Sequence, residues 1–164
     1  AYVLSPEDAT LYRALSARCN YLSQDRPDIA YSAKELCREC ARPTRLSYQK
    51  LTRLGRYLVG KPRLVYEYRY ANSEKLDNTL EVYVDTDFAG CKESCRSTSG
   101  GVCLLNGSNI KQWSKTQSTL TLSSGEAELG GLCKGAANAI GMRSVARDLG
   151  AHLKLTLALS LIHI

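Results

Sequence analysis

The chain has 164 residues, of which 44% are hydrophobic and 23% are charged. This length and composition are typical of a soluble globular protein with one ordinary domain or two very small ones. No run of about 18 apolar residues occurs, so no membrane partner is expected. The start of the chain lacks both an initiator Met and the features of a signal peptide, which indicates an internal piece of a longer protein.

The net charge of +6 is distributed unevenly along the chain. Residues 1–75 contain 14 Lys and Arg against 8 Asp and Glu, whereas residues 76–164 contain 8 of each kind. A basic segment beside a neutral one favours contact with a polyanion, and nucleic acid is the leading candidate. A solvated basic surface without a ligand is an equally weighted alternative.

Apolar residues at helical spacing predict three helices before residue 60, with breaks at residues 25–28 and 42–44. Ser5 and Pro6 suit the N-cap and first turn of the first helix. The second helix is expected to end at about Ala41 and the third at Val59. The expected apolar residues are Leu11, Leu15, Cys19 and Leu22 on the first helix, and Leu46, Leu54, Tyr57 and Leu58 on the third.

The third predicted helix also carries a set of basic residues. These are Arg45, Lys50, Arg53 and Arg56. If they line one broad face, they suit a phosphate backbone, and we take them as candidate nucleic-acid-binding residues. An ordinary exposed amphipathic helix explains the same spacing at least as well.

A tyrosine-rich segment follows. Leu64, Tyr66, Tyr68 and Tyr70 alternate with other residues and predict a strand. Exposed Tyr beside Arg could stack on bases, although half-buried strand packing is the commoner role. The polar stretch after it predicts a boundary, so that residues 1–70 form a helical segment, residues 71–79 a connector, and residues 80–164 a second domain.

The second domain is expected to begin with a strand that ends in two carboxylates. Residues 80–87 alternate, and Asp85 and Asp87 share a parity, so both side chains point to the same face of the sheet. A carboxylate at a strand end is a natural Mg²⁺ ligand. Further strands are expected at residues 101–105 and 109–113, joined by an Asn106-Gly107 turn, with an extended piece at residues 119–122.

A helix is expected from Ser123, with two acids in its first turns. Glu126 and Glu128 lie on nearly opposite sides of such a helix. The residues that follow Glu128 at intervals of four are apolar (Leu132, Ala136, Ile140), which favours Glu128 as the acid on the packed face of the helix. Burying an acid costs free energy unless it is paired or binds a metal. Glu126 suits the solvent-facing helix N-terminus. A last strand is expected at residues 153–159.

The seven cysteines and two histidines give no regular metal-ligand pattern. Cys37 and Cys40 form a CxxC inside an expected helix, and Cys91 and Cys95 form a second loose pair. The odd count and irregular spacing favour reduced thiols in an intracellular protein, so no zinc site is expected.

Several ordered motifs resemble a known family. Residues 12–13, 21–22, 26–31 and 56–60 resemble the segment after the polymerase core of copia-type retrotransposon Pol polyproteins. Residues 85–90, 96–101, 113–117 and 122–128 resemble the RNase H domain of the same family. The resemblance covers about 145 of the 164 residues. It implies an α/β (α+β) fold with a partial RNase H-like mixed sheet of three antiparallel strands, a helix and one further strand, preceded by a small helical segment.

The resemblance also implies a site and partners. Asp85 matches the first catalytic aspartate and Glu128 the catalytic glutamate, both as metal ligands, whereas Asp87 has at most a supporting role. Such enzymes hold two Mg²⁺ ions with four carboxylates and cut the RNA strand of an RNA–DNA hybrid during reverse transcription. The implied partners are that hybrid or another nucleic acid and the rest of the Pol polyprotein. The implied location is the cytoplasm or nucleus, within a virus-like particle for the intact element.

The end of the chain departs from the family. Where a third acid is expected after the last strand, the chain reads Leu159-Ser160-Leu161-Ile162-His163-Ile164, and the fourth acid is missing. We therefore expect a catalytically incomplete fragment as the chain stands. The alternatives are a non-catalytic nucleic-acid-binding remnant and an inert scaffold fragment.

Overall fold

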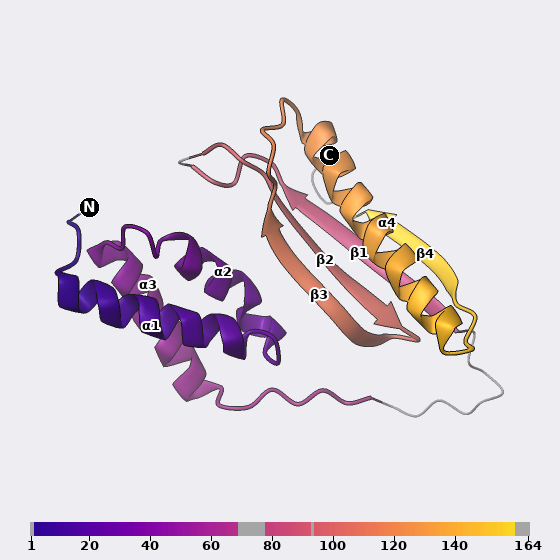
Figure 1. Cartoon of the computed structure of the whole chain (residues 1–164), viewed down its shortest axis with the longest axis horizontal. Coiled ribbons are helices and arrows are strands. Elements are labelled where there is room, and N and C mark those ends of the chain that lie inside the picture. The colour runs from indigo at the N-terminus through magenta and orange to yellow at the C-terminus, as the bar shows by residue number, and fades with distance from the viewer. Residues whose placement is uncertain (1, 69–77, 93, 160–164) are drawn as a thin grey trace. The chain divides into compact units, whose positions relative to one another are not determined.

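The computed structural model describes residues 2–68, 78–92 and 94–159, and the chain divides into two compact units, Ala1–Tyr66 and Glu67–Ile164. Among the described residues, the regular elements of the first, the helical unit, are helices, and the second, the sheet unit, combines a four-stranded mixed sheet with one helix. The predicted fold class, a small helical segment before a mixed α+β sheet, is confirmed (Figure 1). The predicted connector, residues 71–79, falls mostly outside the described residues.

The helical unit follows the capping signals of the sequence. Helix α1 (Pro6–Leu22) begins after Ser5, whose side chain accepts a hydrogen bond from the backbone of Asp8. A short 3₁₀ turn, η1 (Pro27–Ile29), leads into α2 (Ala30–Arg38), which ends three residues before the predicted Ala41. Helix α3 (Arg45–Gly60) starts with a capping box between Thr44 and Ser47.

The core of the helical unit is formed by large side chains from all its helices: Tyr12, Ile29, Leu36, Leu51 and Leu54. The predicted apolar face of α1 was wrong at both ends, because Leu11 is 46% exposed and Leu22 is 37% exposed. Tyr12 is fully buried in their place, and its hydroxyl donates to the Leu36 carbonyl at 2.8 Å. This bond lets a large polar-tipped ring enter the core, which a count of apolar residues overlooks.

The tyrosine-rich segment does not form the predicted strand. Residues 61–68 have no regular secondary structure, and residues 69 and 70 lie outside the described part of the chain. Alternation predicts a strand only where a neighbouring strand satisfies the backbone. On α3, Leu46 is likewise 53% exposed rather than packed, whereas Leu54 is buried as expected.

The sheet unit contains β1 (Thr79–Asp87), β2 (Thr98–Leu105), β3 (Ser108–Thr116), α4 (Ser124–Asp148) and β4 (Lys154–Leu159). The strand order is β3-β2-β1-β4, with β4 parallel to β1 and the other pairs antiparallel. Asn106 and Gly107 form the predicted tight turn, with φ of 48° and 79°. The extended piece at residues 119–122 is no strand.

Helix α4 lies along one face of this sheet (Figure 1). Its buried residues are small and spaced four apart: Ala127, Gly131, Gly135 and Ala139. A Cβ on Gly135 would stand 2.4 Å from Val84, so the glycine lets the helix backbone approach β1 closely. On the same face, the Trp113 ring covers Gly101. Small residues therefore set the spacing between helix and sheet.

Candidate functional site

The first candidate acid, Asp85, lies exposed on β1. Its strand alternates strictly, with Val82, Val84 and Thr86 buried towards α4 and Tyr83, Asp85 and Asp87 exposed. The predicted common face of Asp85 and Asp87 is confirmed, and it is the face that α4 does not cover. Asp85 pairs across the ladder with Gly100. A residue without a side chain at that position leaves the space beside the carboxylate open.

The two acids of α4 have different roles. Glu126 caps the helix: its backbone N–H donates to the Ser123 hydroxyl at 3.1 Å, and its carboxylate accepts from the Leu122 backbone N–H at 2.7 Å. Glu128 is half-buried and accepts a hydrogen bond from the Ser124 hydroxyl at 3.1 Å. The predicted assignment of Glu126 to the solvent-facing helix terminus is confirmed.

The prediction of the buried row of α4 was wrong by one residue along the helix. The buried row starts at Ala127 rather than Glu128, and Ile140, at the end of the predicted row, is 52% exposed. The physical reason is size, because glycine and alanine bring the helix closer to the sheet than Leu132 or Ile140 could. Glu128 lies at the edge of this buried row and not within it.

The fold brings Asp85 and Glu128 to the same end of the sheet. A Cβ on Gly131 would lie 2.4 Å from the Thr86 hydroxyl, so this turn of α4 packs on the last residues of β1. Glu128 lies one turn earlier, about 4.5 Å further along the helix axis. Figure 1 shows α4 beginning at the end of the sheet where β1 finishes. The two acids approach that end from different layers, Asp85 from the open face and Glu128 from the helix.

A network of hydroxyl and amide side chains, for which no functional residue was predicted, holds this end of the sheet unit together. The Gln117 amide donates to the Ser99 hydroxyl and to the Ala127 carbonyl, both at 2.8 Å. The Ser97 hydroxyl lies 2.9 Å from that of Thr121 and accepts from the Ala89 backbone. Ser97 and Ser99 are buried. Their signal in the sequence was a row of hydroxyl residues where strand apolar residues would be expected.

A divalent ion needs more ligands than these two acids. Among the described residues, no group of three or more His, Cys, Asp or Glu side chains is placed to hold a metal ion. Asp87 does not complete such a group, and its carboxylate lies against Gly90. No disulfide joins the cysteines of the described residues, and Cys37 lies in α2 and Cys40 in the turn after it. The residues described therefore do not by themselves fit a two-ion centre.

The four candidate basic residues share one exposed side of α3. At 100° per residue, Arg45, Lys50, Arg53 and Arg56 fall within an arc of about 140°, opposite the buried Leu51 and Leu54. Lys50 forms an ion pair with Glu39. The side chains of the other three form no hydrogen bond or ion pair with any residue that the structure describes.

Comparison with known proteins gives the family. The chain is 37% identical over 123 residues to the retrovirus-related Pol polyprotein from transposon RE1 of Arabidopsis thaliana, a match that covers 74% of this chain and 8% of that polyprotein. It belongs to the retrotransposon Pol polyprotein family. A further relative is an uncharacterized mitochondrial protein, AtMg00810, of the same plant, with 34% identity over 74% of this chain and 49% of the relative. Another is the secreted RxLR effector protein 161 of Plasmopara viticola, with 39% identity over 63% of this chain and 70% of the relative.

The comparisons also set the extent of the likeness. This Pol-family chain spans about half the length of the mitochondrial relative and under a tenth of the polyprotein. No family model and no solved structure matches it. In the described part, no helix is long and apolar enough to cross a membrane. The RNase H chemistry expected from the motifs therefore stays a prediction.

Proposed function

We propose that the sheet unit is the RNase H-like part of a copia-type Pol polyprotein, whose substrate is the RNA strand of an RNA–DNA hybrid and whose cofactor is Mg²⁺. The observation that carries this proposal is that Asp85 and Glu128 lie at the same end of a β3-β2-β1-β4 mixed sheet, in a Pol-family chain. Both would be metal ligands in the assembled centre. The other ligands would come from elsewhere in the polyprotein.

The electrostatics of the two acids support this role. Neither Asp85 nor Glu128 forms an ion pair within the described residues. At an acid without a cationic partner, no neighbouring side-chain cation competes with a bound metal ion, and carboxylate oxygens are the ligands that Mg²⁺ prefers. With two such acids only, we expect weak ion binding and no Mg²⁺-dependent cleavage of a labelled RNA–DNA hybrid by this chain.

The ion site can be tested directly. Mn²⁺ added to the ¹⁵N-labelled chain should broaden amide signals around residues 85 and 128, and Asp85→Asn should abolish that broadening. Glu81→Gln, on the same strand and the same face, is the matched control and should leave it unchanged. Broadening that survives Asp85→Asn would contradict the proposed site, and robust hybrid cleavage by the unmodified chain would contradict its incompleteness.

A second candidate function is a non-catalytic nucleic-acid-binding remnant. The observation in its favour is the exposed arc of unpaired arginines on α3, because binding to phosphates needs accessible cations. Replacing Arg45, Arg53 and Arg56 with Gln should weaken binding of a hybrid and reduce its salt dependence. Binding that is indifferent to these charges would remove this function and favour an inert scaffold fragment.

A further inference from the structure

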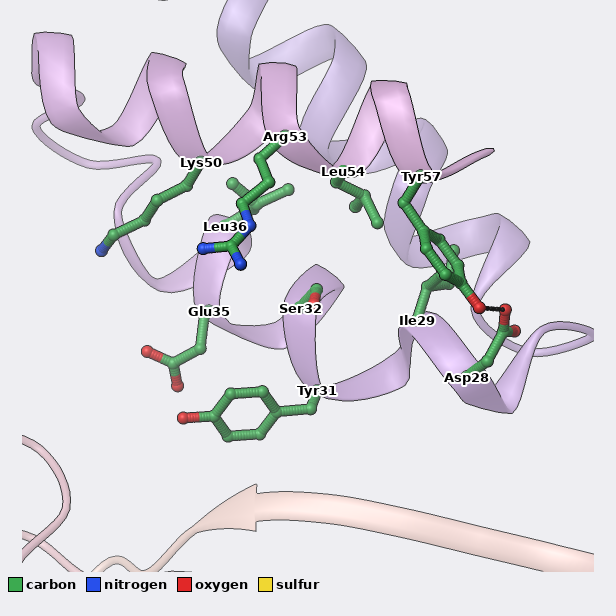
Figure 2. Close-up of a pocket in the computed structure, with 10 residues that line it drawn as sticks. All are labelled: Asp28, Ile29, Tyr31, Ser32, Glu35, Leu36, Lys50, Arg53, Leu54 and Tyr57. Carbon is green, nitrogen blue, oxygen red and sulfur yellow. Dashed lines mark hydrogen bonds between the residues drawn. The ribbon is translucent and has the colours of Figure 1, made fainter. Parts of the chain in front are cut away.

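A pocket of about 580 Å³ lies between α2 and α3 of the helical unit (Figure 2). Its floor is apolar and consists of Ile29, Leu36 and Leu54, each at least nine-tenths buried. Two tyrosines, Tyr31 and Tyr57, stand at its sides. An apolar floor with a few polar groups around it, in a volume of roughly 300–1,000 Å³, is typical of small-molecule sites.

One wall of the pocket is held rigidly. Arg26, 6% exposed, donates two hydrogen bonds to the Asp28 carboxylate, at 3.0 and 2.7 Å. The same carboxylate accepts from the Tyr57 hydroxyl at 2.8 Å (Figure 2). Arg26 also donates to the backbone carbonyl of Lys61, just after α3. These bonds fix the Tyr57 ring before any ligand arrives, which lowers the entropic cost of binding.

The pocket and its ion-pair partners carry excess positive charge. The carboxylates of Asp28 and Glu35 that line it are already paired, the first with Arg26 and the second with Lys34 and Arg38, at 2.7 to 3.0 Å. Lys50 is paired with Glu39. The lining residues and their ion-pair partners, with Arg53 included, thus comprise five cations and three carboxylates. A ligand that complements this charge is an anion.

Arg53 is the cation left for that anion. Its guanidinium points into the pocket (Figure 2) and makes no hydrogen bond or ion pair with the residues described. On the far side, Tyr31 is 56% exposed, and the Lys34 ammonium lies 4.7 Å from its ring centroid. The pocket thus offers a partly exposed aromatic ring, an apolar floor and an unpaired guanidinium, which together suit a flat group that carries a phosphate.

We propose that this pocket binds one unpaired nucleotide of a single-stranded nucleic acid, with the base between the tyrosines and the phosphate on Arg53. The Ser32 hydroxyl and the Glu35 carboxylate at the rim can bond to the edge of the base. This inference rests on the nucleic-acid partner of the proposed function, but not on the RNase H chemistry of the sheet unit. It also separates Arg53 from Arg45 and Arg56, which lie outside the pocket.

The test uses the whole ¹⁵N-labelled chain, titrated with adenosine monophosphate, adenosine and ribose 5-phosphate. We expect adenosine monophosphate to shift amide signals of the pocket residues and to bind at least tenfold more tightly than either part. Arg53→Gln should reduce its affinity to that of adenosine, whereas Arg45→Gln, the matched control on the same helix, should change it less than twofold. Tyr31→Ala should weaken the binding of adenosine but not that of ribose 5-phosphate.

Several results would overturn the assignment. Ribose 5-phosphate binding as tightly as adenosine monophosphate would show that the pocket selects charge alone. Tighter binding of the acidic aromatic peptide acetyl-Asp-Phe-amide would assign the pocket to a protein partner. If Arg53→Gln and Arg45→Gln weaken a labelled RNA–DNA hybrid equally while adenosine monophosphate shifts no pocket signal, the basic helix binds nucleic acid but the pocket does not.

Discussion

The two units use their carboxylates in opposite ways. All four ion pairs within the described residues lie in the helical unit, where Asp28, Glu35 and Glu39 are neutralised by neighbouring cations. In the sheet unit, Asp85 and Glu128 have no cationic partner in the described residues. Charge in the helical unit therefore stabilises the fold, whereas charge at the end of the sheet remains free for a ligand.

The units also pack differently. The helical unit fills its core with large side chains, Tyr12 and Leu36 among them, so that its helices are held apart. The sheet unit brings α4 onto β1 through Gly131 and Gly135, and the valines of the strand fill the space. The first arrangement is sensitive to the loss of a side chain and the second to the gain of one.

The largest effect is expected at the Arg26–Asp28 pair. Hydrogen bonding to Arg26 lowers the pKa of Asp28, and both side chains are largely buried. Arg26→Met leaves this carboxylate without its partner, so we expect the helical unit to lose about 3–5 kcal/mol of stability, measured by urea unfolding and circular dichroism. Arg45→Met, exposed and unpaired, should change stability by less than about 0.5 kcal/mol. Equal effects of the two substitutions would contradict the structural role of the pair.

The next effect concerns the buried Tyr12 hydroxyl. Burial raises the pKa of Tyr12 from 10.0 to about 12. Between these values the unfolded chain loses the phenol proton while the folded chain keeps it, so stability is constant below pH 10 and falls as pH rises towards 12. The difference amounts to at most roughly 2.7 kcal/mol. Tyr12→Phe should remove this component, which is measured as the wild-type minus variant unfolding free energy against pH; a flat difference would refute it.

A smaller effect tests the close approach of α4. A Cβ at Gly135 would stand 2.4 Å from Val84 and 3.2 Å from Leu157, so Gly135→Ala should cost about 1–2 kcal/mol. Gly141, on the same helix, has no atom within 4 Å of such a Cβ. Gly141→Ala should therefore stabilise by about 0.5–1 kcal/mol through helix propensity. Trp113, the single tryptophan, reports unfolding of the sheet unit by fluorescence, and a gain from both substitutions would show that α4 is not tightly packed.

The sequence predicted the elements better than their packed faces. The cap at Ser5, the helix start at Ser123, the Asn106-Gly107 turn and the alternation of β1 are local signals, and the structure follows all of them. Which face a helix buries depends on its partner. Tyr12 displaced Leu11 because a carbonyl on α2 accepts a hydrogen bond from the Tyr12 hydroxyl. The row of α4 moved by one residue because glycines permit a closer contact.

In the candidate site too, the features that depend on local periodicity could be predicted from the sequence, whereas those that depend on tertiary contacts could not. The shared face of Asp85 and Asp87 and the capping role of Glu126 follow from strand and helix periodicity. The pocket beside Arg53 could not be predicted, because it depends on two helices that meet and on a buried Arg26 that fixes Tyr57. An Arg-Pro-Asp triplet was visible in the sequence, but no local rule assigns such a triplet to a tertiary contact.

The smallest expected effect on stability is that of neutralising the two acids of the sheet unit, and it tests whether these acids, unlike those of the helical unit, contribute little to the fold. Asp85→Asn and Glu128→Gln should each change the stability of the sheet unit by less than about 0.5 kcal/mol, measured by Trp113 fluorescence in urea. Asp85 is exposed and unpaired, and a glutamine at position 128 can still accept the Ser124 hydrogen bond through its amide oxygen. A loss above about 1 kcal/mol would give these acids a structural role instead. If stability is unchanged while Mn²⁺ binding is lost, the carboxylates at this end of the sheet serve a ligand and not the fold.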